Sequence, residues 1–178
     1  MECAVNKVID HRNHIVCVNV DLEVDCSELD SFISVEEIIS INRAITDPDN
    51  TDRHLGAGKE SSRFEINRDE DYHYLRNPSI IETLVETKLS YECRKNNNLV
   101  WLTSKIMSHL TQNQAFSEGN KRTSYIVGVL FLIKIQLKYD NTADYPLLDI
   151  DLTNKLQELA VEEINCEKFY KYLKKELS

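Results

Sequence analysis

The sequence predicts a mainly α-helical protein with a small β element. Several segments repeat apolar residues at helical spacing, two of them begin with a recognisable helix cap, and β-branched residues gather in one short stretch near the N-terminus. Hydrophobic residues make up 42% of the 178 and charged residues 29%, an ordinary globular balance. We expect an N-terminal extension at 1–31 and a single domain at 32–178.

The N-terminal extension is predicted to be rich in strand. Ile15–Val20 contains mainly β-branched residues, and the alternation continues through Leu22 and Val24. One or two strands are therefore expected there. His11 and His14 have the spacing of a helical metal pair, but they lie in this strand-like region without further ligands, so we predict no metal site.

The first helix is expected to begin after Ser34. This serine can cap the helix, and Glu37 completes a capping box. Isoleucines at 38, 41 and 45 give the apolar face, which ends near Pro48.

A polar loop follows at 47–74. Within it a short edge strand or flap is expected at Arg63, Phe64, Glu65 and Ile66.

Further helices are predicted along the rest of the chain. Asn77 and Pro78 occupy cap and first-turn positions of one, and a second begins near Leu99. A buried helix is expected from Thr123 to about Lys138, and two short helices end the chain. The last helix places Phe169, Tyr172 and Leu173 on one side, and its lysines at 171, 174 and 175 form a solvated face.

Composition excludes several classes of protein. A net charge of −9 disfavours nucleic-acid binding, because an acidic surface repels phosphate. The apolar run at 125–137 is shorter than the roughly 20 residues that span a bilayer, and the N-terminus lacks the pattern of a signal peptide. The five cysteines are scattered without CxxC spacing, which favours reduced thiols and a cytoplasmic protein.

The stretch QAFSEGNKR at 114–122 carries the functional prediction. The first turn of a helix has unpaired N–H groups and partial positive charge, and Gly119 lets a ligand approach the backbone. Lys121 and Arg122 add full charges, so the stretch suits a phosphate group. Glu118 could bind Mg²⁺ beside that phosphate. The alternative is an ordinary turn with a solvated helix start.

This stretch resembles the signature of the Fic/Doc (Fido) family, in which a histidine opens the motif. The residues at 116 and 118–122 match, and Gln114 stands where the histidine belongs. The segments at 33–39 and 75–84 are similar to the corresponding parts of Doc-type (death-on-curing) proteins. The resemblance covers about 32–178 and implies a Fido-type helical bundle.

The resemblance also implies roles for single residues. Phe116 would anchor the loop in the core and Glu118 would hold the metal. Asn120 would lie near the phosphates, and Lys121 and Arg122 would bind the phosphate chain of ATP or a related nucleotide. Lysine at 121, and Tyr125 where AMP transferases often carry a second arginine, favour the Doc type. Members of that type move a phosphoryl group to a translation factor, and the segment at 63–66 would be the flap that docks the target.

The replacement of the histidine by Gln114 predicts reduced catalysis. Glutamine has no group that titrates near neutral pH, and general-base help contributes about 10²–10⁴-fold in rate. Positioning and electrostatic stabilisation would survive. Three interpretations stay open. The chain is a pseudoenzyme that binds a nucleotide or a partner, or an active kinase or adenylyltransferase (AMPylation) toxin that uses another base or needs none, or an engineered or selected inactive form. His109, five residues earlier on the preceding helix, points away and is expected to be a packing residue.

Regulation and partners follow from the same resemblance. The inhibitory segment of many Fic enzymes is not encoded, because glutamate precedes glycine or asparagine only at Glu118-Gly119. An antitoxin-like protein of a toxin–antitoxin system would then supply control. A further alternative is a non-enzymatic Fido scaffold that binds a protein partner.

Overall fold

The computed structural model describes residues 18–46, 75–139 and 150–177. These residues are mainly helical, which confirms the predicted fold class. In chain order the elements are the 3-10 helix η1 (Cys26–Ser31), α1 (Val35–Thr46), α2 (Pro78–Glu82), the π-helix η3 (Thr83–Lys88), α3 (Leu89–Lys95), α4 (Leu99–Asn113), α5 (Asn120–Tyr139), α6 (Ile150–Ala160) and α7 (Cys166–Leu177). Predicted features at 63–66 and at His11 and His14 lie outside the described residues.

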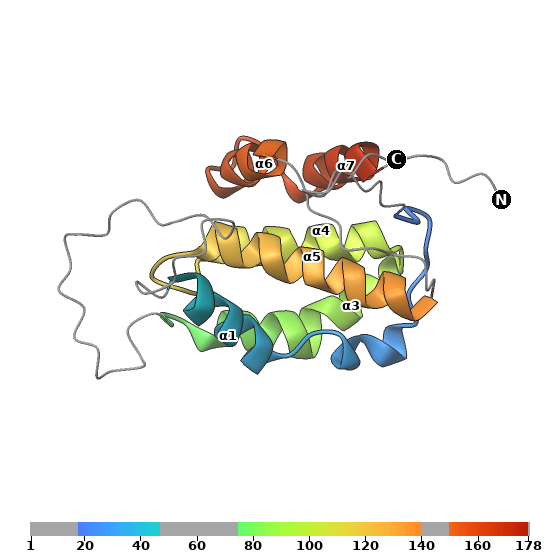
Figure 1. Cartoon of the computed structure of the whole chain (residues 1–178), viewed down its shortest axis with the longest axis horizontal. Helices are drawn as coiled ribbons and strands as arrows, with labels where there is room; N and C mark the ends of the chain where they lie inside the picture. Colours follow the sequence, from blue (N-terminus) through green and yellow to red (C-terminus); the bar gives the residue numbers. More distant parts are fainter. Residues whose placement is uncertain (1–17, 47–74, 140–149, 178) are drawn as a thin grey trace.

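Helices α4 and α5 form the centre of the molecule (Figure 1). The apolar residues of α4 are almost completely buried, Leu102, Ile106 and Met107 among them. Gly128 of α5 faces Met107, and a Cβ at position 128 would lie 2.3 Å from the Met107 Cε atom. The glycine therefore lets the two helices approach closely.

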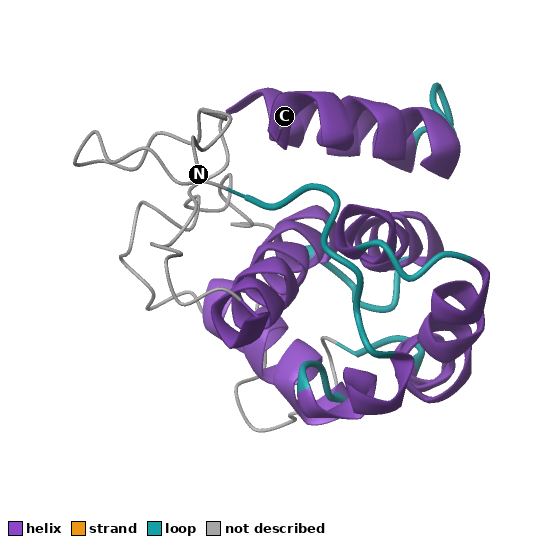
Figure 2. Cartoon of the chain, turned by 90° about the vertical axis from the view of Figure 1, so that its right-hand side faces the viewer, coloured by secondary structure: helices purple, strands orange, loops and turns teal. Residues whose placement is uncertain are grey.

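The other helices cover this central pair. Helices α1 and α2–α3 lie on one side of it, and α6 and α7 form a layer on another side (Figures 1 and 2). Phe169, Leu173 and Leu177 of α7 are buried, whereas Lys171 and Lys175 are exposed. The predicted division of the last helix into an apolar and a solvated face is confirmed for these residues, whereas Lys174 is half-buried and forms an ion pair with Asp21 at 2.9 Å.

Helix α1 begins where the sequence predicts. The Ser34 Oγ accepts a hydrogen bond from the Glu37 N–H at 3.1 Å, which is the expected cap. The Glu37 carboxylate, however, forms an ion pair with Lys134 of α5. In the predicted capping box the Glu37 side chain would bond back to the start of the helix. Its ion pair instead joins α1 to α5.

The N-terminal prediction requires a correction over its described part. Residues 18–24 form no strand: they contain a turn, in which the Leu22 N–H donates to the Asn19 carbonyl at 3.2 Å, and an isolated bridge between Glu23 and Asn98. The Leu99 N–H donates to the Leu22 carbonyl and the Val24 N–H donates to the Asn97 carbonyl, both at 2.8 Å. The segment pairs with a helix-connecting loop that offers only these few partners, so its β propensity is not realised as a strand.

The cysteine prediction is wrong for one pair. Cys26 of η1 and Cys93 of α3 form a disulfide, with 5.8 Å between their Cα atoms. These residues are 67 positions apart, so their spacing gave no signal. Cys166 is a free thiol, as expected.

Helix α5 confirms the predicted core helix but begins earlier, at Asn120 rather than Thr123. The residues Asn120, Lys121 and Arg122 therefore belong to its first turn. Among the described residues no helix has the length and apolarity needed to cross a bilayer.

Candidate phosphate-binding site

A six-residue loop at 114–119 joins the central helices and carries most of the predicted site. Gln114 ends α4 in the left-handed conformation, with φ 51° and ψ 56°, and its side chain is exposed. Gly119 has φ 76°, and a Cβ there would lie 2.8 Å from Thr46 Cγ2 and 2.9 Å from Asn42 Nδ2. Glycine is therefore required both by the backbone conformation and by the closeness of α1.

Asn42 of α1 binds the end of the loop through its side-chain amide. Its side chain is fully buried, and its Nδ2 donates to the Glu118 carbonyl at 3.0 Å and to the Thr123 Oγ1 at 2.9 Å. These bonds fix the end of the loop and the first turn of α5 against α1.

Asn120 closes the loop on itself. Its Oδ1 accepts from the Phe116 N–H at 3.0 Å, and its Nδ2 donates to the Phe116 carbonyl at 2.8 Å. The Phe116 side chain is 2% exposed and lies in the core. The Asn120 side chain thus shapes the loop, because both polar atoms of its amide group bond to the Phe116 backbone.

A pocket of about 430 Å³ opens beside this loop. The predicted site residues that line the pocket come from the loop and from α5. The opposite wall consists of residues of α6 and of the turn after it. The lining residues are Thr111, Gln114, Gly119, Asn120, Lys121, Arg122, Gln157, Ala160 and Val161. The structure therefore brings five of the predicted site positions to one cavity.

The two cations of the site are positioned by protein acceptors. Arg122 donates through Nη1 to the Ile45 carbonyl at 3.0 Å, at the last turn of α1. Lys121 donates to the Gln157 Oε1 of α6. Both charged groups are thereby held at the pocket, where the first turn of α5 adds the partial positive charge of a helix N-terminus.

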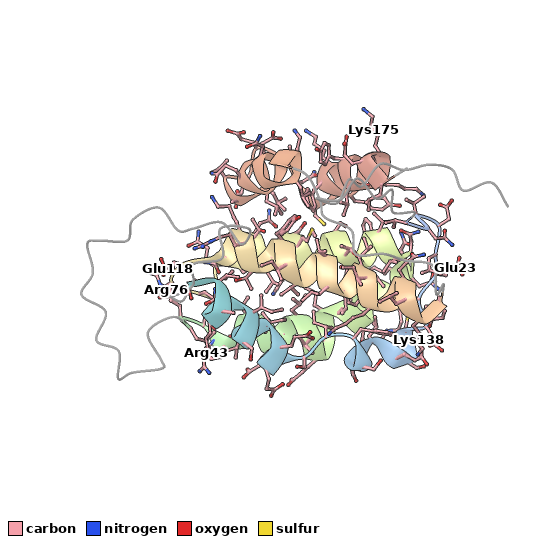
Figure 3. All side chains as sticks on the ribbon, viewed as in Figure 1. Glu23, Arg43, Arg76, Glu118, Lys138 and Lys175 are labelled. Carbon is pink, nitrogen blue, oxygen red and sulfur yellow. A yellow bond between two sulfur atoms is a disulfide. The ribbon has the colours of Figure 1, made fainter. Side chains whose placement is uncertain are left out.

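Glu118 lies apart from these residues. It is half-buried and does not belong to the pocket lining. Figure 3 shows Glu118 and the exposed Arg76 at the same end of the molecule. The Arg76 and Asn77 N–H groups both donate to the Ala115 carbonyl, at 2.9 and 3.1 Å, so the segment before α2 is bound directly to the loop.

His109 is a packing residue, as predicted. Its side chain is 7% exposed, its Nε2–H donates to the Ile80 carbonyl at 2.9 Å, and its Nδ1 accepts from Lys88 Nζ at 2.8 Å. Burial is the main cause that lowers the pKa of His109, and the Lys88 charge adds to it. The ring is fully engaged and is not a substitute base for position 114.

No group of three or more potential metal ligands occurs among the described residues. A magnesium ion bound by the Glu118 carboxylate would take further ligands from oxygens of the nucleotide and from water.

The sequence-based prediction missed three residues of the site. Asn42 and Gln157 lie 72 and 43 positions from Gln114 along the chain, in helices that the prediction treated as scaffold. Arg76 was part of the stretch similar to Doc-type proteins but received no role. Their place beside the loop follows from helix packing, which single-sequence spacing does not reveal.

The comparisons with known proteins bear on this arrangement. A model of the Fic/DOC family matches residues 32–132, which is more than half of the chain and includes the loop and α5 as far as residue 132. The chain belongs to the Fic/DOC family. Neither the curated proteins nor the solved structures contain a match. For a Fic/DOC protein the loop between α4 and α5 is the motif loop, and the C-terminal wall of the pocket lies beyond the matched residues.

Proposed function

We propose that this Fic/DOC protein binds ATP or a related nucleotide in the pocket at the start of α5. The observation that carries the proposal is the convergence of Lys121, Arg122 and the first turn of α5 on one cavity. An arginine fork, an ammonium group and a helix N-terminus each favour phosphate, and together they provide several charge-assisted donors. Glu118 would hold a magnesium ion that neutralises part of the phosphate charge.

Gln114 determines the proposed chemistry. It lines the pocket. The resemblance of 114–122 to the Fic/Doc signature puts it where the motif histidine belongs, and its amide can orient a hydroxyl group but cannot take its proton. We therefore propose a transferase-related protein with impaired catalysis. A toxin-type kinase or adenylyltransferase that acts on a translation factor under control of an antitoxin-like partner is the active alternative.

The non-enzymatic scaffold is the second candidate. Its support is that Lys121 and Arg122 already have acceptors within the protein, Gln157 and the Ile45 carbonyl. In that case the contacts of the two cations would serve only to join α5 to its neighbours.

Calorimetry with ATP and Mg²⁺ separates the two candidates. Lys121→Ala removes an exposed cation, and we expect ATP affinity to fall about 10-fold or more, since a hydrogen bond to a charged group contributes about 1.5–3 kcal/mol. Lys175→Ala is the matched control, because Lys175 is an exposed helical lysine at a distance from the loop (Figure 3). Equal ATP affinity in the two variants, or no binding to the unchanged chain, would favour the scaffold.

A further inference from the structure

The contact between η3 and α4 brings a lysine and a histidine together outside the pocket. Lys88 is the last residue of the π-helix η3, and its Nζ lies 2.8 Å from the Nδ1 of His109 on α4. π-helices are rare and occur frequently at functional sites. Neither residue lines the pocket beside the motif loop. The pair therefore belongs to a different place in the fold.

The hydrogen bonds of His109 determine which ring nitrogen can accept a proton. Its Nε2 lies 2.9 Å from the Ile80 carbonyl, which can only accept, so Nε2 carries the hydrogen of the neutral ring. Nδ1 then has a lone pair, and this lone pair faces Lys88. Nucleophilic sites commonly have this order of groups, in which a base contacts the nucleophile and a third group orients the base.

The surroundings of Lys88 favour its neutral amine. Lys88 is half-buried, and burial is the main cause that lowers its pKa. The charge of Lys105 on α4 adds to the lowering, whereas Glu92 on α3 and Cys166 on α7 oppose it. Glu92, one turn after Lys88, forms an ion pair with Lys105 at 3.5 Å. The hydrogen-bond partner of Lys88 is a neutral ring and not a carboxylate.

A second lysine of the same helical run has a different environment. Lys95 ends α3, its side chain is exposed, and its Nζ lies 4.0 Å from the centre of the Tyr91 ring. A hydrogen bond with Tyr91 is the main cause that raises the pKa of Lys95. Lys95 therefore keeps its proton more firmly than Lys88, although Lys95 is more open to solvent.

We infer that Lys88 is a site of acylation, at which His109 acts as the base when an acyl phosphate or an acyl thioester transfers its acyl group. The neutral amine attacks the carbonyl carbon of the donor, and a C–N bond forms. The bond from that carbon to the phosphate oxygen or to the thiolate sulfur breaks, and its electron pair leaves with this group. His109 Nδ1 accepts the proton that the nitrogen loses and passes it to water. This reaction needs no nucleotide in the pocket, so it is independent of the proposed function.

Acylation would change a contact that leads to the motif loop. It replaces the ammonium charge of Lys88 with a neutral amide, whose N–H can still donate to His109 Nδ1. Asn113, which precedes Gln114, donates to the His109 carbonyl at 2.8 Å. The modified side chain is therefore linked through His109 to the end of α4.

The test measures the acylation of individual lysines in the full chain. The chain is incubated with acetyl phosphate or with acetyl coenzyme A at about pH 7.5, and peptide mass spectrometry follows the acetylated fractions of Lys88 and Lys95 with time. We expect Lys88 to react about 10-fold or more faster than Lys95 with at least one donor, because Lys88 has more neutral amine and an adjacent base. The donor that gives this preference identifies the source of the acyl group.

His109→Gln removes the base and keeps an amide that can donate to the Ile80 carbonyl. We expect the rate at Lys88 to fall about 10-fold or more and the rate at Lys95 to stay unchanged. Thermal unfolding checks that the variant folds; if it does not, the comparison of Lys88 with Lys95 in the unchanged chain decides. A rate at Lys88 equal to or below that at Lys95 with both donors would overturn the inference. So would an unchanged rate at Lys88 in the folded variant.

Discussion

At the scale of single residues, the proposed function makes Gln114 the residue that limits the chemistry of the site. It lies at the end of α4 with its side chain at the pocket, and the rest of the loop is held by Asn42 and Asn120 independently of the residue at 114. A change at this position should therefore alter the reaction without altering the loop.

Gln114→His is expected to produce label transfer from ATP to protein. The imidazole would restore a group that accepts a proton near neutral pH, and we expect a rate increase of about 10²–10⁴-fold over the unchanged chain. Parallel assays with γ-labelled and α-labelled ATP distinguish phosphoryl from AMP transfer. Gln114→Asn is the control, since it keeps a neutral amide. Equal rates for the histidine and asparagine variants would contradict the assigned role of position 114.

The single-residue predictions succeeded where a local pattern sets the outcome. Ser34 caps α1 because its hydroxyl accepts a hydrogen bond from the N–H of Glu37, three residues later in the chain. Gly119 has the left-handed conformation that glycine favours. The roles of Asn42 and Gln157 could not be predicted, because they depend on which helices pack beside the loop.

At the scale of elements, α4 contacts η3 and α2 through the titratable residue His109. The same end of α4 leads into the motif loop. His109 accepts from Lys88 of η3 and donates to the Ile80 carbonyl of α2, and Asn113, beside Gln114, donates to the His109 carbonyl at 2.8 Å. Protonation of the ring would place a second cation next to Lys88. The contact therefore requires neutral His109.

This requirement predicts a loss of stability in mild acid. The pKa of His109 in the folded protein is lower than the usual 6.5, which applies to the unfolded chain. At a pH between these two pKa values the unfolded chain binds more protons than the folded protein. The stabilisation that neutral His109 contributes is complete above about pH 6.5. It is lost as the pH falls through the pKa of His109 in the folded protein. We expect the Tm to decrease from about pH 7.5 to about pH 5.5, as measured by thermal unfolding.

His109→Gln supplies the comparison. The variant keeps an amide that can donate to the Ile80 carbonyl but has no titrating ring, so its Tm should be lower at neutral pH and should change less over the same interval. A slope equal to that of the unchanged chain would show that His109 does not cause the effect.

Element boundaries were predicted less well than element types. The buried helix was expected from Thr123 but begins at Asn120, because the polar residues of its first turn hide the apolar periodicity. The expected strand at 18–24 did not form, since the segment pairs with residues at 97–99 and not with another strand.

At the scale of the whole molecule, the segment that contains η1 is attached to the helical bundle. The attachment lies at the end of the bundle opposite the motif loop. Glu28 of η1 forms an ion pair with Lys138 and accepts from the Tyr139 hydroxyl at 2.9 Å, at the end of α5. In Figure 3, Lys138 and Glu23 lie at the far end from Glu118. The disulfide between Cys26 and Cys93 adds a covalent link in this region.

Loss of this disulfide is expected to destabilise the fold. For a closed loop of 67 residues the chain-entropy treatment gives about 4 kcal/mol. The double variant Cys26→Ser/Cys93→Ser should lose about this free energy of unfolding in urea, and reductant should lower the stability of the unchanged chain but not that of the double variant. Cys166→Ser is the control, because Cys166 is free. An unchanged stability of the double variant would contradict the role of the link.

The disulfide also bears on the cytoplasmic location that the sequence predicts. Disulfides persist in oxidising compartments, whereas cytosolic thiols are kept reduced. Differential alkylation of protein taken directly from its host would show which state Cys26 and Cys93 have there. The link itself could not be predicted, because its two cysteines meet only through the packing of η1 on α3.

The central claim is that the start of α5 and the loop before it bind a phosphorylated ligand. The most direct test is a titration of isotope-labelled protein with ATP and Mg²⁺, followed by amide nuclear magnetic resonance. We predict that the largest shift changes occur at Gly119, Asn120, Lys121 and Arg122. Unchanged amides at these four positions at saturating ATP, with any changes confined to other parts of the chain, would contradict the claim.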